Sequence, residues 1–204
     1  MELFRLSIVY LHLIACCVAI GLVLTSDIAM VTQLFKGDAE KKQEAAHLNS
    51  LKTTVSLALA ALWVTGIAVI WLDVSVKGFA YYFSNPKLQA KLTIVALLTL
   101  NGFVLHSAVM PAIEKAGWLL QMPFNQRMLA IFAGAVSAVS WFYAAMLGVG
   151  RPLAWKYSLV QLLAAYPALI ASGFVAMVSL TVWSKYRSNL DFTRFVEAHP
   201  REMK

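Results

Sequence analysis

The segment from Leu92 to Met110 runs for 19 residues without an Asp, Glu, Lys or Arg. About 20 apolar residues in a helix cross the hydrocarbon core of a bilayer, so this segment predicts a membrane-spanning helix. Four further segments share this character, and the sequence therefore predicts one all-α domain, residues 1–204, a polytopic integral membrane bundle of five transmembrane helices. The expected spans are residues 6–26, 53–72, 91–111, 128–149 and 157–183, with a polar segment at 30–52 and a basic C-terminal tail at 185–204.

Composition supports a membrane protein and argues against two other classes. Hydrophobic residues make up 60% of the 204 residues, and charged residues make up 13%. A soluble domain has about 45–50% hydrophobic and about 25% charged residues. A membrane β-barrel would instead show alternation over strands of about 10 residues. The net charge of +7 comes from basic residues in loops and in the tail. That placement is typical of orientation signals and lipid contacts, and it predicts no nucleic-acid partner.

The basic residues also predict an orientation. Five spans put the termini on opposite sides, with 11 basic residues on the C-terminal side and 6 on the other. The positive-inside rule then favours an N-terminus outside and a C-terminus in the cytoplasm of a bacterial cytoplasmic membrane. The first apolar run, residues 6–25, is longer than the apolar core of a signal peptide, and we interpret it as a retained span.

Two cysteines, Cys16 and Cys17, are neighbours inside the first span. Adjacent helical side chains point about 100° apart, so a disulfide between them is not expected. Small buried apolar residues are the simpler interpretation, and soft metal ligands are the alternative.

Polar residues inside the third span mark it as the candidate working surface. Lys91 stands at its start, Asn101 near its middle and His106 further along. At about 100° per residue, Lys91, Gly102 and His106 fall on one side of the helix. Gly102 lies one turn before His106 and leaves a gap beside the imidazole.

The first span adds His12 and, at its far end, Asp27. His12 is expected about 9 Å below the membrane face that Lys91 borders, and His106 roughly 21 Å below it. These depths predict two polar pairs, His12 with Lys91 and Asp27 with His106. The mismatch of about 12 Å argues against both histidines clamping one haem.

Each of these residues also has a purely structural interpretation. A histidine in a span can hydrogen-bond a neighbouring helix, and Asn101 can do the same. Lys91 can extend its ammonium to lipid headgroups. Asp27 fits an ordinary interfacial position.

The chemistry open to such a set is limited. The sequence has no GxSxG, HExxH, CxxC or glycine-rich phosphate loop, so a conventional hydrolase is not supported. Neutral imidazole is a good ligand for haem iron or copper. The functions that remain open are electron transfer, porphyrin chemistry, transport and assembly of a membrane complex.

Two short motifs carry a family resemblance. Leu11-His12 followed by small and apolar residues resembles the first helix of the HemJ-type protoporphyrinogen oxidases and of the related copper-resistance protein D family. Lys91 followed by Leu-Thr-Ile-Val-Ala-Leu-Leu is similar to a later helix of these proteins. The resemblance implies a membrane bundle that binds haem b, with His12 and Lys91 as its functional pair. Asn101-Gly102 stand here where the family has Tyr-His.

The first hypothesis is therefore a haem b- or porphyrin-binding membrane protein in electron transfer or porphyrin oxidation, an oxidoreductase with a redox partner or a second copy. His12 is the leading cofactor and metal ligand and His106 the second, with Asn101 and Gly102 beside the cofactor and Lys91 in the catalytic role. A copper or other small-solute permease is the alternative, using the soft sulfurs of scattered methionines. A non-catalytic subunit or assembly factor is the third.

Overall fold

The computed structural model describes residues 2–36, 45–150 and 156–198, and all regular structure in them is helical. The elements in chain order are α1 (Glu2–Lys36), α2 (Ala45–Lys77), α3 (Phe79–Phe83), α4 (Pro86–Val104), the π-helical turn η1 (Leu105–Val109), α5 (Met110–Ala116), the 3₁₀ turn η2 (Leu119–Gln121), α6 (Phe124–Val149) and α7 (Leu159–Ala198).

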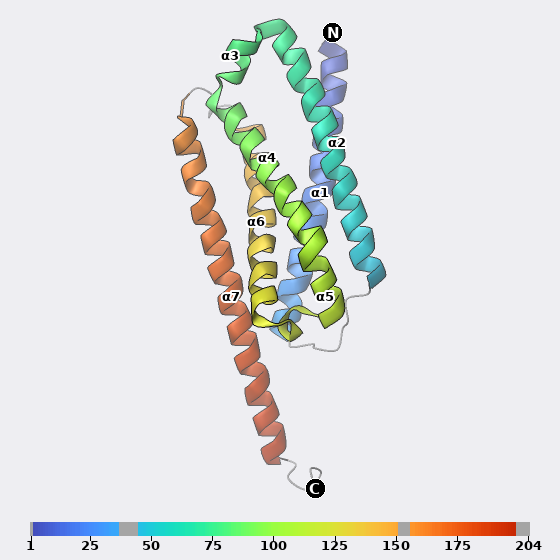
Figure 1. Ribbon diagram of the computed structural model, residues 1–204, viewed down its shortest axis with the longest axis vertical. Coiled ribbons are helices and arrows are strands. Elements are labelled where there is room, and N and C mark those ends of the chain that lie inside the picture. The colour runs from blue at the N-terminus through green and yellow to red at the C-terminus, as the bar shows by residue number, and fades with distance from the viewer. Residues whose placement is uncertain (1, 37–44, 151–155, 199–204) are drawn as a thin grey trace.

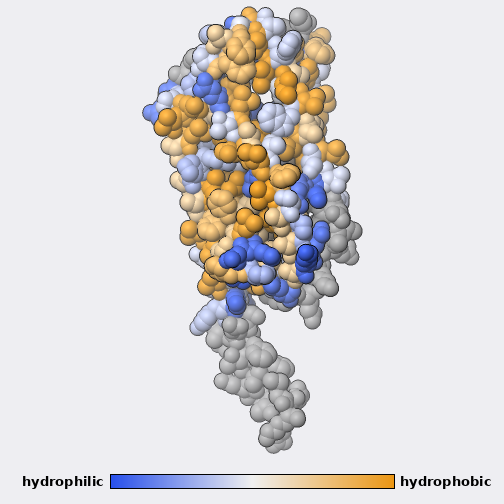
Figure 2. All heavy atoms as spheres, in the orientation of Figure 1, coloured by the Kyte–Doolittle hydropathy of each residue, from blue (hydrophilic) through white to orange (hydrophobic). Residues whose placement is uncertain are grey.

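Five helical segments of the described chain are long and apolar enough to cross a membrane. They are Leu3–Phe35, Lys52–Lys77, Pro86–Ala116, Phe124–Val149 and Leu159–Arg187. The predicted all-α bundle with five transmembrane helices is therefore confirmed. Large apolar side chains are exposed along all of these segments, and Figure 2 shows them over the sides of the molecule, with a hydrophilic band toward its lower end. A lipid bilayer is the environment that such a surface requires.

Local signals explain where the helices start and end. Gly78 has φ 83°, a left-handed conformation that suits glycine, and α2 ends there. Asn85 caps α4, because its side chain accepts a hydrogen bond from the backbone N–H of Lys87 at 3.0 Å. Pro86 follows in the first turn of α4, where a missing N–H costs little.

The third span continues past its predicted end at Pro111. In η1 the N–H of Met110 donates to the carbonyl of Leu105, one residue further back than in an α-helix. This wider turn places Pro111 in the first turn of α5, and the helical path continues to Ala116. Gly117, with φ 81°, then ends it.

Polar sequence did not end the helices where we expected. Within the predicted polar segment 30–52, α1 continues to Lys36 and α2 begins at Ala45, while the predicted N-cap Asp38 lies outside the described residues. The tail predicted from residue 185 is helical as far as Ala198. Lys, Arg, Glu and Gln are good helix formers, so these helices extend beyond their apolar parts.

Helix α6 lies at the centre of the bundle (Figure 1) and packs against α4 and α7, while α1 pairs with α2. Its buried residues include four alanines, and a Cβ at Gly173 of α7 would lie 3.8 Å from the Cβ of Ala135 on α6. Small residues allow this close approach in a membrane. We call the end where α1 begins the N-terminal face and the end where α6 begins the C-terminal face, toward which α7 extends beyond its neighbours (Figure 1).

Candidate functional site

Two polar levels lie inside the bundle, and His12 belongs to the one nearer the N-terminal face. Its Nδ1 lies 2.8 Å from the hydroxyl of Thr65 on α2. That hydroxyl donates its own hydrogen to the carbonyl of Ala61 at 2.6 Å, so it accepts from His12. His12 is thereby held as the tautomer with Nδ1–H, which leaves Nε2 with a lone pair. Position 66 is a glycine, and a Cβ there would lie 3.5 Å from the imidazole.

Lys91 belongs to the same level. Its Nζ is 3.8 Å from the place where a Cβ of Gly148 on α6 would stand, and its ammonium is close enough to act electrostatically on His12 and Cys16. Lys91 makes no hydrogen bond or ion pair with any residue that the structure describes. The predicted His12–Lys91 pair thus shares one level, without a direct bond.

Two side-chain hydrogen bonds fasten the third span to its neighbouring helices. The indole N–H of Trp63 on α2 donates to the hydroxyl of Thr99 on α4 at 3.0 Å. The side-chain amide of Asn101 donates to the backbone carbonyl of Ala133 on α6 at 2.9 Å. The structure therefore gives Asn101 the bridging role that we weighed beside cofactor binding.

A cavity of about 800 Å³ forms the second level, and α1, α2, α4, α6 and α7 all contribute to its wall. The wall is mostly apolar and includes Gly102, where a Cβ would meet no atom within 4 Å. Leu100 and Phe103 also line it although 66% and 74% of their surfaces are exposed. The cavity therefore opens sideways toward lipid beside α4.

His106 lies on the wall of this cavity, in the π-helical turn η1. Its Nε2 is 3.0 Å from the hydroxyl of Ser56 on α2, and its Nδ1 is buried without a partner among the described residues. An unpaired buried nitrogen costs about 1–3 kcal/mol. His106 therefore has a ring nitrogen that packing alone does not satisfy.

Asp27 and Lys52 also line the cavity. Neither forms a hydrogen bond or an ion pair with the described part of the chain, and Lys52 is close enough to act electrostatically on His106. The predicted pair of Asp27 and His106 therefore shares one cavity, and the direct partner of His106 is Ser56.

The two histidines are far apart along the membrane normal. Their partners on α2, Thr65 and Ser56, are nine residues apart in sequence, which is about 13 Å along a helix. The structure thus agrees with the predicted mismatch, and His12 does not line the cavity. Among the described residues, no group of three His, Cys, Asp or Glu side chains could hold a metal ion.

Our sequence analysis missed the contribution of α2. Ser56, Leu59, Ala60 and Trp63 line the cavity, and their spacing of three or four residues puts them on one helical face. That spacing could have been recognised, but which face turns inward depends on the packing of α1 and α4. Comparison of the chain with protein-family models, with curated proteins and with solved structures gives no match.

Proposed function

We propose that the chain binds haem b or a related porphyrin in the cavity and acts in electron transfer or porphyrin oxidation. The observation that carries this proposal is the cavity itself, about 800 Å³ in volume, with His106 on its wall. Pockets for organic cofactors have about this size and are mostly apolar with a few polar groups. The haem would supply the redox chemistry, and the chain its position and surroundings.

A histidine that binds haem iron has two structural needs. An axial histidine is held through its second ring nitrogen, and the macrocycle needs apolar room beside it. His12 meets the first need, because Thr65 holds Nδ1. His106 meets both, since Ser56 holds Nε2 and the cavity lies beside the ring, and Nδ1 is then the nitrogen that would bind the iron. The cavity therefore favours His106 as the ligand.

Other residues around the cavity suit the same cofactor. The aromatic rings of Trp63, Phe103 and Trp141 line it and offer flat apolar surfaces for a macrocycle. Lys52, also on the wall, would pair with a propionate. The resemblance gives the functional role to His12 and Lys91, and in this proposal they form the polar level between the cofactor and the N-terminal face.

The test is the visible spectrum of the purified protein, air-oxidised and then dithionite-reduced, after haem-supplemented expression. We expect a Soret band with sharp reduced α and β bands. His106→Ala should lose the band, while His12→Ala, the matched intramembrane histidine, should keep it. If only His12→Ala loses the Soret band, the haem belongs to the polar level of His12, nearer the N-terminal face. A wild-type spectrum without a Soret band would overturn the proposal.

A second pair of variants tests the cavity without touching a histidine. Gly102→Leu places a large side chain in the open space and should abolish binding. Gly21→Leu is the control, because Gly21 is an exposed helical glycine of α1 with no atom within 4 Å of its Cβ position and lies outside the cavity. Equal haem content in both variants would contradict the assignment.

One observation favours copper as the second candidate. Met30, Met110 and Met177 come from three different helices and line the cavity together with His106. Thioether and imidazole ligands suit Cu(I). Competition with a Cu(I) chelator would test this candidate, with affinity expected to fall in Met30→Leu and Met177→Leu and to stay unchanged in Met146→Leu, which faces outward.

A further inference from the structure

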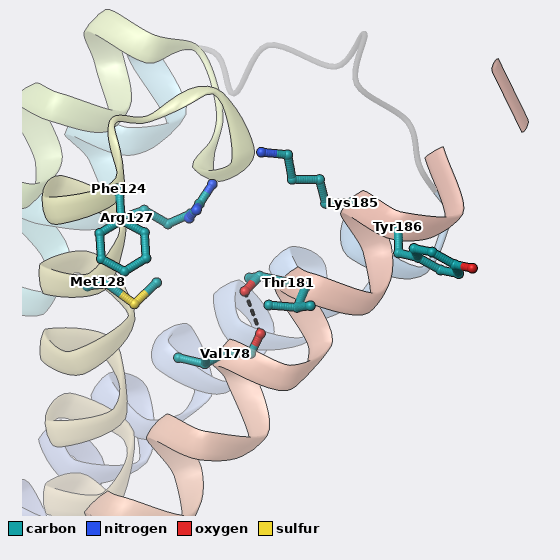
Figure 3. Close-up of a pocket in the computed structure, with 8 residues that line it drawn as sticks. Phe124, Arg127, Met128, Val178, Thr181, Lys185 and Tyr186 are labelled. Carbon is teal, nitrogen blue, oxygen red and sulfur yellow. Dashed lines mark hydrogen bonds between the residues drawn. The ribbon is translucent and has the colours of Figure 1, made fainter. Parts of the chain in front are cut away.

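A second, smaller pocket lies near the C-terminal face, between the start of α6 and α7 (Figure 3). Its volume is about 270 Å³. The wall consists of Phe124, Arg127, Met128, Val178, Thr181, Val182, Lys185 and Tyr186. It shares no residue with the cavity of His106.

Two cations converge at one end of this pocket. Arg127 on α6 and Lys185 on α7 point toward one another (Figure 3), and the lining holds no carboxylate. Neither cation forms an ion pair with a residue in the described ranges. The Nε of Arg127 is moreover buried without a hydrogen-bond partner. A buried guanidinium N–H normally has an acceptor, and none of the described residues supplies one here.

The start of α6 adds to the positive potential. Pro123 is its N-cap and provides no side-chain cap. The first backbone N–H groups of a helix have no partner within the helix, and its dipole favours an anion at this end. The pocket therefore combines two side-chain cations with a helix start, a combination suited to a phosphate group.

The opposite end of the pocket is apolar. Met128, Val178 and Val182 form it, and the hydroxyl of Thr181 is already used, since it donates to the carbonyl of Val178 at 2.7 Å. The membrane-spanning segments begin at Phe124 and end at Arg187, so the cations lie at headgroup level and the apolar end lies deeper. A soluble anion would need only the two cations, whereas a phospholipid uses both the cations and the apolar end of the pocket.

We propose that this pocket binds the headgroup end of an anionic phospholipid. The phosphate lies between Arg127 and Lys185, and the upper part of one acyl chain packs against Met128, Val178 and Val182. The lipid thereby joins α6 to α7 at the C-terminal face. Basic pockets between transmembrane helices recognise lipid headgroups by this combination of charge and apolar contact.

The experiment measures thermal unfolding of the delipidated full-length protein in neutral detergent. Added phosphatidylglycerol should raise the Tm by several degrees, because a ligand that binds only the folded state stabilises it. Phosphatidylcholine should raise it less, since its choline repels the two cations, and inorganic phosphate should have almost no effect. An equal shift with inorganic phosphate would show a site for soluble anions and would overturn the lipid proposal.

Variants locate the effect. Arg127→Gln/Lys185→Gln should lose more than half of the shift, while Lys115→Gln, an exposed lysine of the same face, should keep it. A full shift in the double variant overturns the proposal. If that variant does not fold, Val182→Trp serves instead, because Val182 is exposed and the larger ring fills the apolar end. A full shift in Val182→Trp would likewise overturn it.

Discussion

His12 shows how one hydroxyl can fix the state of an imidazole. Thr65 donates to Ala61 and accepts from His12, so the ring carries its proton on Nδ1. Thr65→Val keeps the shape of the side chain and removes the acceptor. We expect ¹⁵N chemical shifts of His12 to report the Nδ1–H tautomer in the wild type and a mixture in the variant. An Nε2–H tautomer in the wild type would contradict the assignment.

Tyr82 gives a residue-scale prediction at the N-terminal face, outside the membrane-spanning segments. Burial raises the pKa of Tyr82 to about 12, and the carboxylate of Asp73, which also pairs with Arg5 at 2.8 Å, acts in the same direction. Between pH 10 and about 12 the unfolded phenol is ionised and the folded one is not. Unfolding then releases a proton, so stability falls as the pH rises through this window.

Tyr82→Phe should remove this loss. We therefore expect the Tm of the wild type to fall more steeply than that of the variant between pH of about 9 and about 11.5. Tyr81→Phe is the control, because Tyr81 is an exposed neighbour in α3. Parallel pH profiles for the wild type and Tyr82→Phe would show that the phenol is not held neutral.

At the scale of the elements, α4 depends on the Asn101 amide for its attachment to α6. Asn101→Ala removes the hydrogen bond to Ala133. It should lower the free energy of unfolding by about 0.6 kcal/mol, the average for interhelical side-chain hydrogen bonds in a membrane, and by no more than about 1.7 kcal/mol. Ser107→Ala should change it less, since the Ser107 hydroxyl bonds only within its own helix. Haem content should stay unchanged in both variants. A loss of haem in Asn101→Ala would show that Asn101 contributes to cofactor binding.

The same elements show what the sequence could and could not predict. The five spans follow from long uncharged runs, and the start of α4 follows from Asn85-Pro86. The extended end of the third span depends on the π-helical turn before Pro111, and an uncharged run gives no sign of that turn. His106 was singled out from its own helix, but its partner Ser56 is set by how α2 rotates against α4, and such non-local packing has no local signal.

At the scale of the whole molecule, the cavity opens toward lipid. Its exposed lining residues are Ser56, Ala60, Leu100 and Phe103, and all four lie within membrane-spanning segments. An apolar ligand would therefore enter from the bilayer. This arrangement suits a hydrophobic macrocycle, and the ionisable groups Asp27, Lys52 and His106 lie on the wall that such a ligand would meet.

The distribution of basic residues predicts which face meets the cytoplasm, and this prediction depends on the basic residues of the C-terminal tail. The loops and span ends before residue 185 contribute six basic residues on each side, so the excess comes from the last 20 residues. These are Lys185, Arg187, Arg194, Arg201 and Lys204. All of them lie within about 20 residues of the last span, the distance over which the positive-inside rule acts.

Cysteine labelling tests this orientation in a background in which Cys16 and Cys17 are alanine. Ser84→Cys and Gln121→Cys place single exposed thiols on the N-terminal and C-terminal faces. A membrane-impermeant maleimide should label Ser84→Cys in intact spheroplasts and Gln121→Cys only after permeabilisation. Because the excess lies in the tail, replacing its five basic residues with glutamine should make both sites partly accessible. Unchanged labelling in that variant would show that the loops alone set the orientation, and the inverted pattern in the wild type would place the N-terminus in the cytoplasm.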